Sequence, residues 1–183
     1  MTQELKKSME AVAHSRKQAI EERKKADYSD MVYYVNAKVT GASNTISLID
    51  STTKKVAGIT NFDGNVIGLG KAFPVSAMRV LYSTEGASEG AVNWQNREFL
   101  PAELQNAQLT LKQGKNILVS LPLTDLQNFK MKEFRMLATL PVLRDKEPFE
   151  LEIEMPKNAI LPLKGALQDY LRIEFKGVQR KSI

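Results

Sequence analysis

The sequence predicts a mainly β protein, an antiparallel two-sheet sandwich that follows an N-terminal α-helical arm. Three observations support this fold class. β-Branched and aromatic residues cluster in about ten short runs, each bounded by Gly, Pro, Asn, Asp or Ser. No helical segments alternate with these runs, which argues against a parallel α/β sheet. Several runs alternate apolar and charged residues, as half-buried antiparallel strands do.

The first 27 residues are predicted to form one helix, because they contain no Gly or Pro and are rich in Lys, Glu, Gln, Ala and Arg. Arg16 interrupts the row of apolar positions, so the apolar stripe is narrow and the helix buries little by itself. We therefore expect it to dock on a partner. The predicted docking positions are Leu5, Met9, Val12 and Ile20.

A change of composition marks the predicted domain boundary. Asp27-Tyr28-Ser29-Asp30 is a stretch of polar turn formers, and the apolar run Met31-Val32-Tyr33-Tyr34-Val35 follows it. The sequence therefore divides into a basic helical arm, residues 1–30, and a β-sandwich domain, residues 31–183.

The strand predictions rest on runs of β-formers and on the turn residues between them. Asp63-Gly64 and Gln113-Gly114-Lys115 are predicted hairpin turns, and all seven prolines are predicted at strand ends or in loops. Residues 85–105 are expected to form a long exposed connection, and 125–132 a short helix. The predicted strands are 31–40, 45–50, 55–60, 66–69, 75–83, 108–112, 116–121, 133–139, 149–155 and 170–178.

Composition restricts the chemistry and the location. The chain of 183 residues has no cysteine, which excludes disulfides, thiolate zinc sites and cysteine nucleophiles. The N-terminus lacks the apolar segment of a secretory signal, and no run approaches the roughly 18 apolar residues of a membrane span. We expect a soluble protein made in a cytoplasm. The formal charge of +5 favours acidic partners.

The residue patterns do not predict an enzyme, a cofactor or a metal site. His14, the only histidine, lies in the solvated arm without a group to orient it. The stretch from Gly64 to Lys71 has five residues between Gly64 and Gly70 and lacks the Ser or Thr of a phosphate-binding loop. Glu150, Glu152 and Glu154 share one face of a strand, which predicts a solvated outer face. Asn61 and Asp63 lack the spacing of an EF-hand calcium loop.

Basic residues at both ends make nucleic-acid or inner-membrane contacts an alternative for the arm. Arg180 and Lys181 stand near the C-terminus. Five acidic residues dilute the seven basic ones of the arm, and this near-balance favours an ion-paired helix over one that follows phosphates. The seven basic arm residues are Lys6, Lys7, Arg16, Lys17, Arg23, Lys24 and Lys25.

Three functions follow from these patterns: a virion building block, a nucleic-acid-binding β-barrel with a basic arm, and a carbohydrate or ligand module. The third would build its site from loop residues, with Trp94 as the exposed contact beside Tyr82 and Asn93. The first gives the arm a partner, because a poorly amphipathic helix gains stability by docking on neighbours.

The layout of many short strands behind a basic arm resembles the single jelly-roll capsid and penton proteins of icosahedral viruses, including small or membrane-containing phages. The residues that carry the resemblance are Phe149-Glu150-Leu151-Glu152-Ile153-Glu154-Met155-Pro156 and the closing run from Tyr170 to Val178. The resemblance implies eight strands in two sheets and self-association around a symmetry axis. It also implies an arm that contacts neighbouring subunits, other capsid proteins or the particle interior, in a virion assembled in the host cytoplasm.

Overall fold

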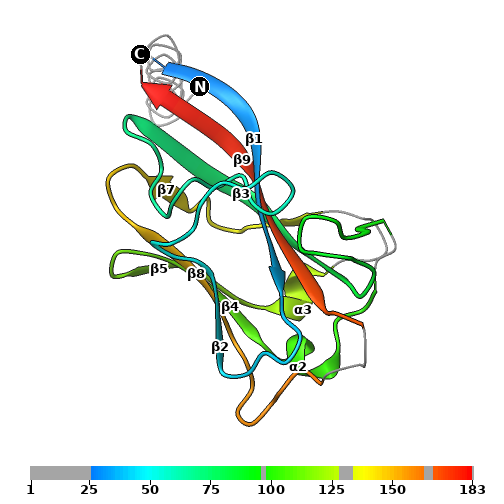
Figure 1. Ribbon diagram of the computed structural model, residues 1–183. Helices are drawn as coiled ribbons and strands as arrows, with labels where there is room; N and C mark the ends of the chain where they lie inside the picture. The colour runs from blue at the N-terminus through cyan, green and yellow to red at the C-terminus, as the bar shows by residue number, and fades with distance from the viewer. Residues whose placement is uncertain (1–25, 96–97, 128–133, 163–166, 183) are drawn as a thin grey trace, which may run out of the picture.

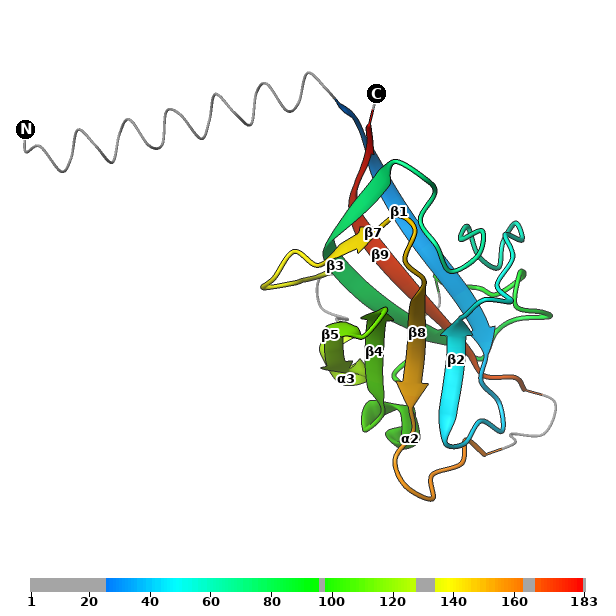
Figure 2. The ribbon, with the colours of Figure 1, turned by 90° about the vertical axis from the view of Figure 1, so that its left-hand side faces the viewer.

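Two antiparallel β-sheets pack face to face in the computed structural model, which describes residues 26–95, 98–127, 134–162 and 167–182. The predicted two-sheet, mainly β architecture is confirmed. The predicted helix over residues 1–27 falls almost entirely outside the described residues. Figure 2 shows the two layers, with β1, β9 and β3 in one and β2, β8, β4 and β5 in the other.

The first sheet has three long strands and two short ones. The long strands are β1 (Ala26–Lys38), β3 (Lys71–Ser83) and β9 (Tyr170–Ser182). The short strands β6 (Arg135–Met136) and β7 (Val142–Arg144) both pair with β3, at different points along it. The order is β1-β9-β3-β6, so β9 is central and β1 forms one edge (Figure 1).

The second sheet has the order β2-β8-β4-β5. Its strands are β2 (Thr45–Ile49), β8 (Phe149–Glu154), β4 (Gln108–Gln113) and β5 (Asn116–Pro122). Two short helices, α2 (Ala102–Gln105) and α3 (Leu123–Leu126), lie in the connections around β4 and β5. The predicted hairpin between β4 and β5 is confirmed, and Gly114 adopts the positive φ of 56° that its turn requires.

The core lies between the sheets and follows the alternation of the strands. In β9, Leu171, Ile173 and Phe175 are buried. In β8, the buried residues are Phe149, Leu151 and Ile153, while Glu150 and Glu154 are exposed on the outer face. Both predicted alternations are confirmed, because a strand buried on one face needs an apolar residue at every second position.

One end of the core is closed by Phe62, which comes from the connection between β2 and β3. Its ring stacks on Tyr33 at 4.6 Å between centroids and lies 5.3 Å from Phe149 and 5.7 Å from Phe175. These rings join both sheets, so the connection contributes directly to the core.

The same connection corrects the predictions for residues 55–60 and 66–69. Neither segment forms a strand, and each contributes only isolated bridges, such as Val56 with Thr60 and Ile67 with Asp145. Gly58 and Gly64, with φ of 82° and 83°, turn the chain repeatedly. The predicted hairpin at Asp63-Gly64 is therefore wrong, because there are no paired strands on either side of it.

Several boundaries also differ from the predictions. β1 begins at Ala26 and includes the polar stretch Asp27–Asp30, which pairs with β9 from Lys181 to Val178. β3 begins at Lys71 and contains Pro74, which was predicted at a strand end. β7 was not predicted, and in the described part of the predicted strand 133–139, residues 134–139, only Arg135–Met136 is strand. α3 begins two residues before the predicted helix 125–132 and ends at Leu126.

Gln113, at the end of β4, ties the second sheet to β7 of the first. It is buried, and its amide accepts a hydrogen bond from the Arg144 backbone N–H at 3.0 Å. It donates in turn to the carbonyl oxygens of Arg144 and Glu147, both at 2.9 Å. This side chain therefore fixes the position of β7 and the loop after it.

Candidate functional site

The predicted site residues of the arm, Lys6 to Lys25 and the docking positions Leu5, Met9, Val12 and Ile20, lie outside the described residues. The structure does place the C-terminal cations. β9 pairs with β1 so that Arg180 faces Tyr28 and Lys181 faces Asp27. Arg180 and Lys181 therefore lie beside the first residues of β1.

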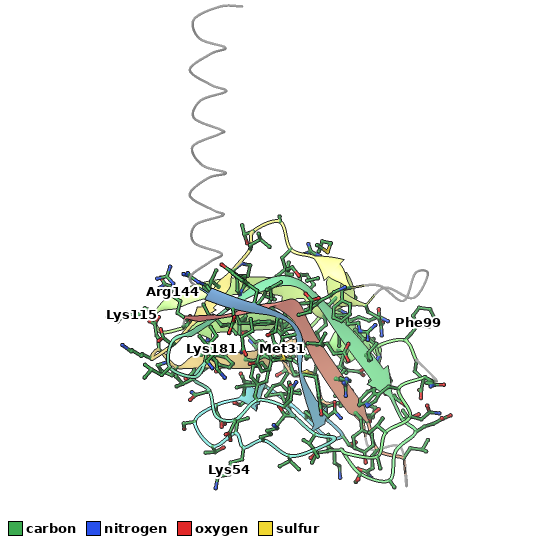
Figure 3. The ribbon with its side chains drawn as sticks, turned by 90° about the horizontal axis from the view of Figure 1, so that it is seen from above. Met31, Lys54, Phe99, Lys115, Arg144 and Lys181 are labelled. Atoms are coloured by element: carbon green, nitrogen blue, oxygen red, sulfur yellow. The ribbon has the colours of Figure 1, made fainter. Side chains whose placement is uncertain are left out.

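Two further cations join them through strand pairing. Lys71 of β3 is directly opposite Lys181, and Ala72 is flanked by Arg180 on one side and by Arg144 of β7 on the other. We call Lys71, Arg144, Arg180 and Lys181 the basic end. The salt bridges found among the described residues involve none of these four. Figure 3 shows Arg144 and Lys181 from above, at the end where the termini lie.

Sequence reasoning identified Arg180 and Lys181 but missed Lys71 and Arg144. Lys71 was considered only as part of a phosphate-binding loop, and Arg144 lies in a strand that was not predicted. Lysines directly opposite each other on neighbouring strands repel, so an anionic partner would stabilise this arrangement. No local signal in the sequence predicts the cluster, because it forms through pairing over more than 70 residues.

A polar pocket of about 410 Å³ lies below this end, between β1, the end of β9 and the connection that contains Phe62. Tyr33 accepts a hydrogen bond from the Gln179 side chain at 2.6 Å, and burial raises the pKa of the Tyr33 hydroxyl. Lys55, Lys71 and Asp63 contribute charged groups to the wall. Polar and charged side chains therefore contribute much of this lining.

Asn61, which also lines the pocket, has a structural role. Its side-chain oxygen accepts a hydrogen bond from the Tyr34 backbone N–H at 2.7 Å, and its amide donates to the Val32 carbonyl at 2.8 Å. It therefore substitutes for a missing strand at the edge of β1. Among the described residues there is no group of three or more His, Cys, Asp or Glu side chains that could hold a metal ion.

The charged groups of a cluster on the outer face of the first sheet pair with one another. Glu174 is only 5% exposed and forms ion pairs with Arg79 and, at 2.6 Å, with Arg172. The Arg172 guanidinium lies 4.0 Å from the ring centre of Tyr34, and that of Arg79 lies 4.4 Å from Phe134. Because both arginines are held by the carboxylate and by a ring, this cluster stabilises the sheet.

Tyr82 and Asp169 form a buried contact at the opposite end of the sheet. The Tyr82 hydroxyl donates a hydrogen bond to the Asp169 carboxylate, and the Asp169 backbone N–H donates to the Thr40 hydroxyl at 2.5 Å. Burial, followed by the bond to Asp169, raises the pKa of Tyr82 far above its usual value. These contacts fix the chain where it enters β9.

The residues considered for a carbohydrate site differ in exposure. Tyr82 is buried in the core, Trp94 is half-buried in the connection after β3, and the Asn93 amide donates to the Glu85 carboxylate at 3.1 Å. That connection was predicted to be exposed along its length, yet it also carries the buried residues Leu100 and Leu104. Those two leucines face the core, because α2 turns the chain there.

An apolar strip lies along the side where the edges β5 and β6 meet. A depression of about 220 Å³ there is lined by residues 118–121 of β5 and by Arg135 and residues 137–139. Met136 is 68% exposed, and Ile117 and Leu140 are similarly open. We call Ile117, Leu118, Leu121, Met136, Leu137 and Leu140 the apolar edge. An exposed apolar strip at a sheet edge is typical of an interaction surface.

The outer face of the second sheet is polar, as predicted for Glu150, Glu152 and Glu154. The Lys112 ammonium lies 2.7 Å from the Glu152 carboxylate, which raises the pKa of Lys112. In the part of the chain that the structure describes, no helix is long and apolar enough to cross a membrane. Comparisons with family models, with curated proteins and with solved structures found no match to this chain.

Proposed function

We propose that this protein is a virion structural protein, a capsid, penton or minor capsid subunit, that self-associates through a jelly-roll domain. The observation that carries the proposal is the strand order. β6 and β7 pair with successive parts of β3 and act together as one interrupted edge strand, which gives four strand positions in each sheet.

The connections between these positions follow the jelly-roll pattern. After β1 the chain crosses to β2, returns to β3, and crosses again to β4. β4 and β5 form the hairpin within the second sheet, and the chain then returns to β6 and β7, crosses to β8, and ends in β9. Two sheets of four strand positions linked in this way suit a double Greek key, the jelly roll used by viral capsid domains.

The apolar edge supports self-association. Edges of open sheets are usually protected by charges or covered by other segments. Here Ile117 and Met136 are exposed beside an open depression. We assign this strip to contact with a second copy of the chain, because a symmetric assembly needs a self-complementary or ring-forming surface on each subunit.

The N-terminal arm would contact neighbouring subunits or the particle interior. β1 continues directly from the arm, and its first residues lie beside Arg180 and Lys181. The basic end therefore lies where β1 begins.

Light scattering after size-exclusion chromatography tests the proposal. We expect the full chain to form oligomers whose population increases with concentration, and Met136→Asp to shift them towards monomer. Ile160→Asp is the matched control, since Ile160 is 61% exposed but lies in the connection after β8, away from the apolar edge. A full chain that stays monomeric at every concentration would contradict the proposed function.

A further inference from the structure

We propose that the basic end binds anionic lipid surfaces, with Leu69 as an apolar anchor that inserts into the headgroup region. This inference goes beyond the proposed function and does not depend on self-association. It rests on how strand pairing and one rigid turn place an exposed leucine at the end of the sheet that carries four cations.

The Leu69 side chain is 77% exposed, the largest exposed fraction among the described large apolar residues. It occupies the second position of a four-residue turn that the Lys71 N–H closes on the Gly68 carbonyl at 3.0 Å. Gly70, the third residue, has a φ of 71°. A positive φ at the third position is typical of a type II turn and favours glycine there. The turn therefore holds Leu69 at its tip.

The turn is fixed at its base. The Gly70 N–H donates to the Asp145 carboxylate at 2.9 Å, and Ile67 is buried and bridges to Asp145. Because the tip is already held in place, presenting Leu69 to a partner costs little further ordering.

The strands that begin or end beside this turn carry the four cations of the basic end, with Lys71 and Lys181 on one face of the sheet and Arg144 and Arg180 on the other. Lys71 follows Leu69 by two residues, Arg144 precedes the Asp145 that binds the turn, and Arg180 and Lys181 pair with Ala72 and Lys71. The acidic neighbours are Asp27, opposite Lys181, Asp145 beneath the turn, and Asp63 in the pocket wall; Lys55 of the same wall adds a further cation, so basic groups predominate. Lysine and arginine next to an anionic bilayer strengthen binding, and the attraction adds over the cations present.

An aromatic residue, Tyr28, lies in the same line of paired residues as Arg180 and Arg144. Tyr28, Arg180, Ala72 and Arg144 stand opposite one another across β1, β9, β3 and β7, and Tyr28 is half exposed. Tyrosine is common at the level of lipid headgroups, where its ring and its hydroxyl meet different surroundings. The basic residues alone would also suit nucleic acid, but an isolated aliphatic side chain at the tip favours a lipid surface over a phosphate chain.

Flotation of the full chain with vesicles tests the inference, using phosphatidylcholine with 30% phosphatidylglycerol and phosphatidylcholine alone. We expect binding to the anionic vesicles only, and Leu69→Ser should weaken it about tenfold, as expected for the lost burial of one leucine. Ile160→Ser makes the same kind of change, from an aliphatic side chain to serine, at an exposed residue distant from the basic end. It should leave binding unchanged.

The charge requirement has its own pair of variants. Arg144→Gln with Arg180→Gln should weaken binding at least tenfold, whereas Lys38→Gln with Lys157→Gln, which removes the same charge elsewhere, should weaken it much less. All four variants keep the arm, so if the arm alone bound the vesicles, all four would bind equally well.

Two results would overturn the inference. The first is binding to anionic vesicles that Leu69→Ser leaves unchanged. The second is tight, salt-sensitive binding of a duplex DNA, equally insensitive to Leu69→Ser, by a chain that does not float with vesicles, since this would assign the basic end to nucleic acid. Oligomer mass measured on the same samples separates this failure from failure of the proposed assembly.

Discussion

Gly177 of β9 packs directly against Pro74 of β3. A Cβ atom on Gly177 would overlap the Pro74 carbonyl oxygen and would lie 2.9 Å from the ring of Phe73. The register between β3 and β9 shifts just beyond this point, between Val75 and Ala77. The absence of a side chain at Gly177 therefore lets β9 approach closely to the proline-containing part of β3.

Gly177→Ala is expected to destabilise the protein by at least about 2 kcal/mol, because the methyl group meets backbone and a buried ring that cannot move aside. Chemical denaturation measures the change. Gly68→Ala is the control, since its Cβ would make an ordinary 3.5 Å contact with the Lys71 side chain, and its effect should stay within about 0.5 kcal/mol. Equal effects of the two changes would refute the packing argument.

Gln113→Met is expected to cost about 1–3 kcal/mol, since it leaves partly buried backbone groups of Arg144 and Glu147 without their amide partner. Gln108→Met provides the same change at an exposed site, where the amide bonds only to the Ser120 hydroxyl at 2.9 Å. Hydrogen exchange would locate the effect: faster exchange should be confined largely to β7 and the loop after it. Faster exchange throughout the domain would instead indicate a general loss of core packing.

Tyr82 gives an alkaline limit to stability. Its folded pKa is raised above the unfolded value of about 10, so its contribution is fully present below pH 10 and is lost as the pH rises further. Above pH 10 the wild type should lose up to about 1.4 kcal/mol per pH unit more than Tyr82→Phe does. Denaturation midpoints between pH 8 and 11 measure this difference. Parallel profiles for the two proteins would show that Tyr82 does not titrate on unfolding.

The arm is predicted to act through its apolar positions. Met9→Asp should weaken the assembly more than Lys6→Ala, because a docked helix depends on its narrow apolar stripe and an exposed lysine contributes little. Sedimentation velocity of the two variants compares them directly. A larger effect of Lys6→Ala would favour contact with an acidic partner in place of helix docking.

The local pattern of apolar and polar residues was sufficient to identify strands that bury one face. The alternation in 149–154 and 171–176 identified β8 and β9, and Gln113-Gly114-Lys115 identified the hairpin, because burial and turn geometry act on neighbouring residues. It failed for 55–60 and 66–69, whose β-formers close loops around Gly58 and Gly64. It also failed for Asp27–Asp30, polar residues that become strand because β9 extends beside them.

The basic end could be predicted only in part, because strand pairing between residues far apart in the sequence creates it. Arg180 and Lys181 are visible as a basic terminus, but Lys71 and Arg144 join them only through long-range pairing of β3 with β9 and β7. Leu69 carries no signal of its own in the sequence. Its exposure depends on the turn that Gly70 and Asp145 hold in place.

Native mass spectrometry of the full chain measures the stoichiometry of its oligomers, and a capsid or penton subunit should close around a symmetry axis. We expect one predominant oligomer of fixed stoichiometry, which Met136→Asp converts to monomer and Ile160→Asp leaves intact. A spectrum of monomer alone across the concentration range, or an open-ended ladder of sizes, would contradict this expectation.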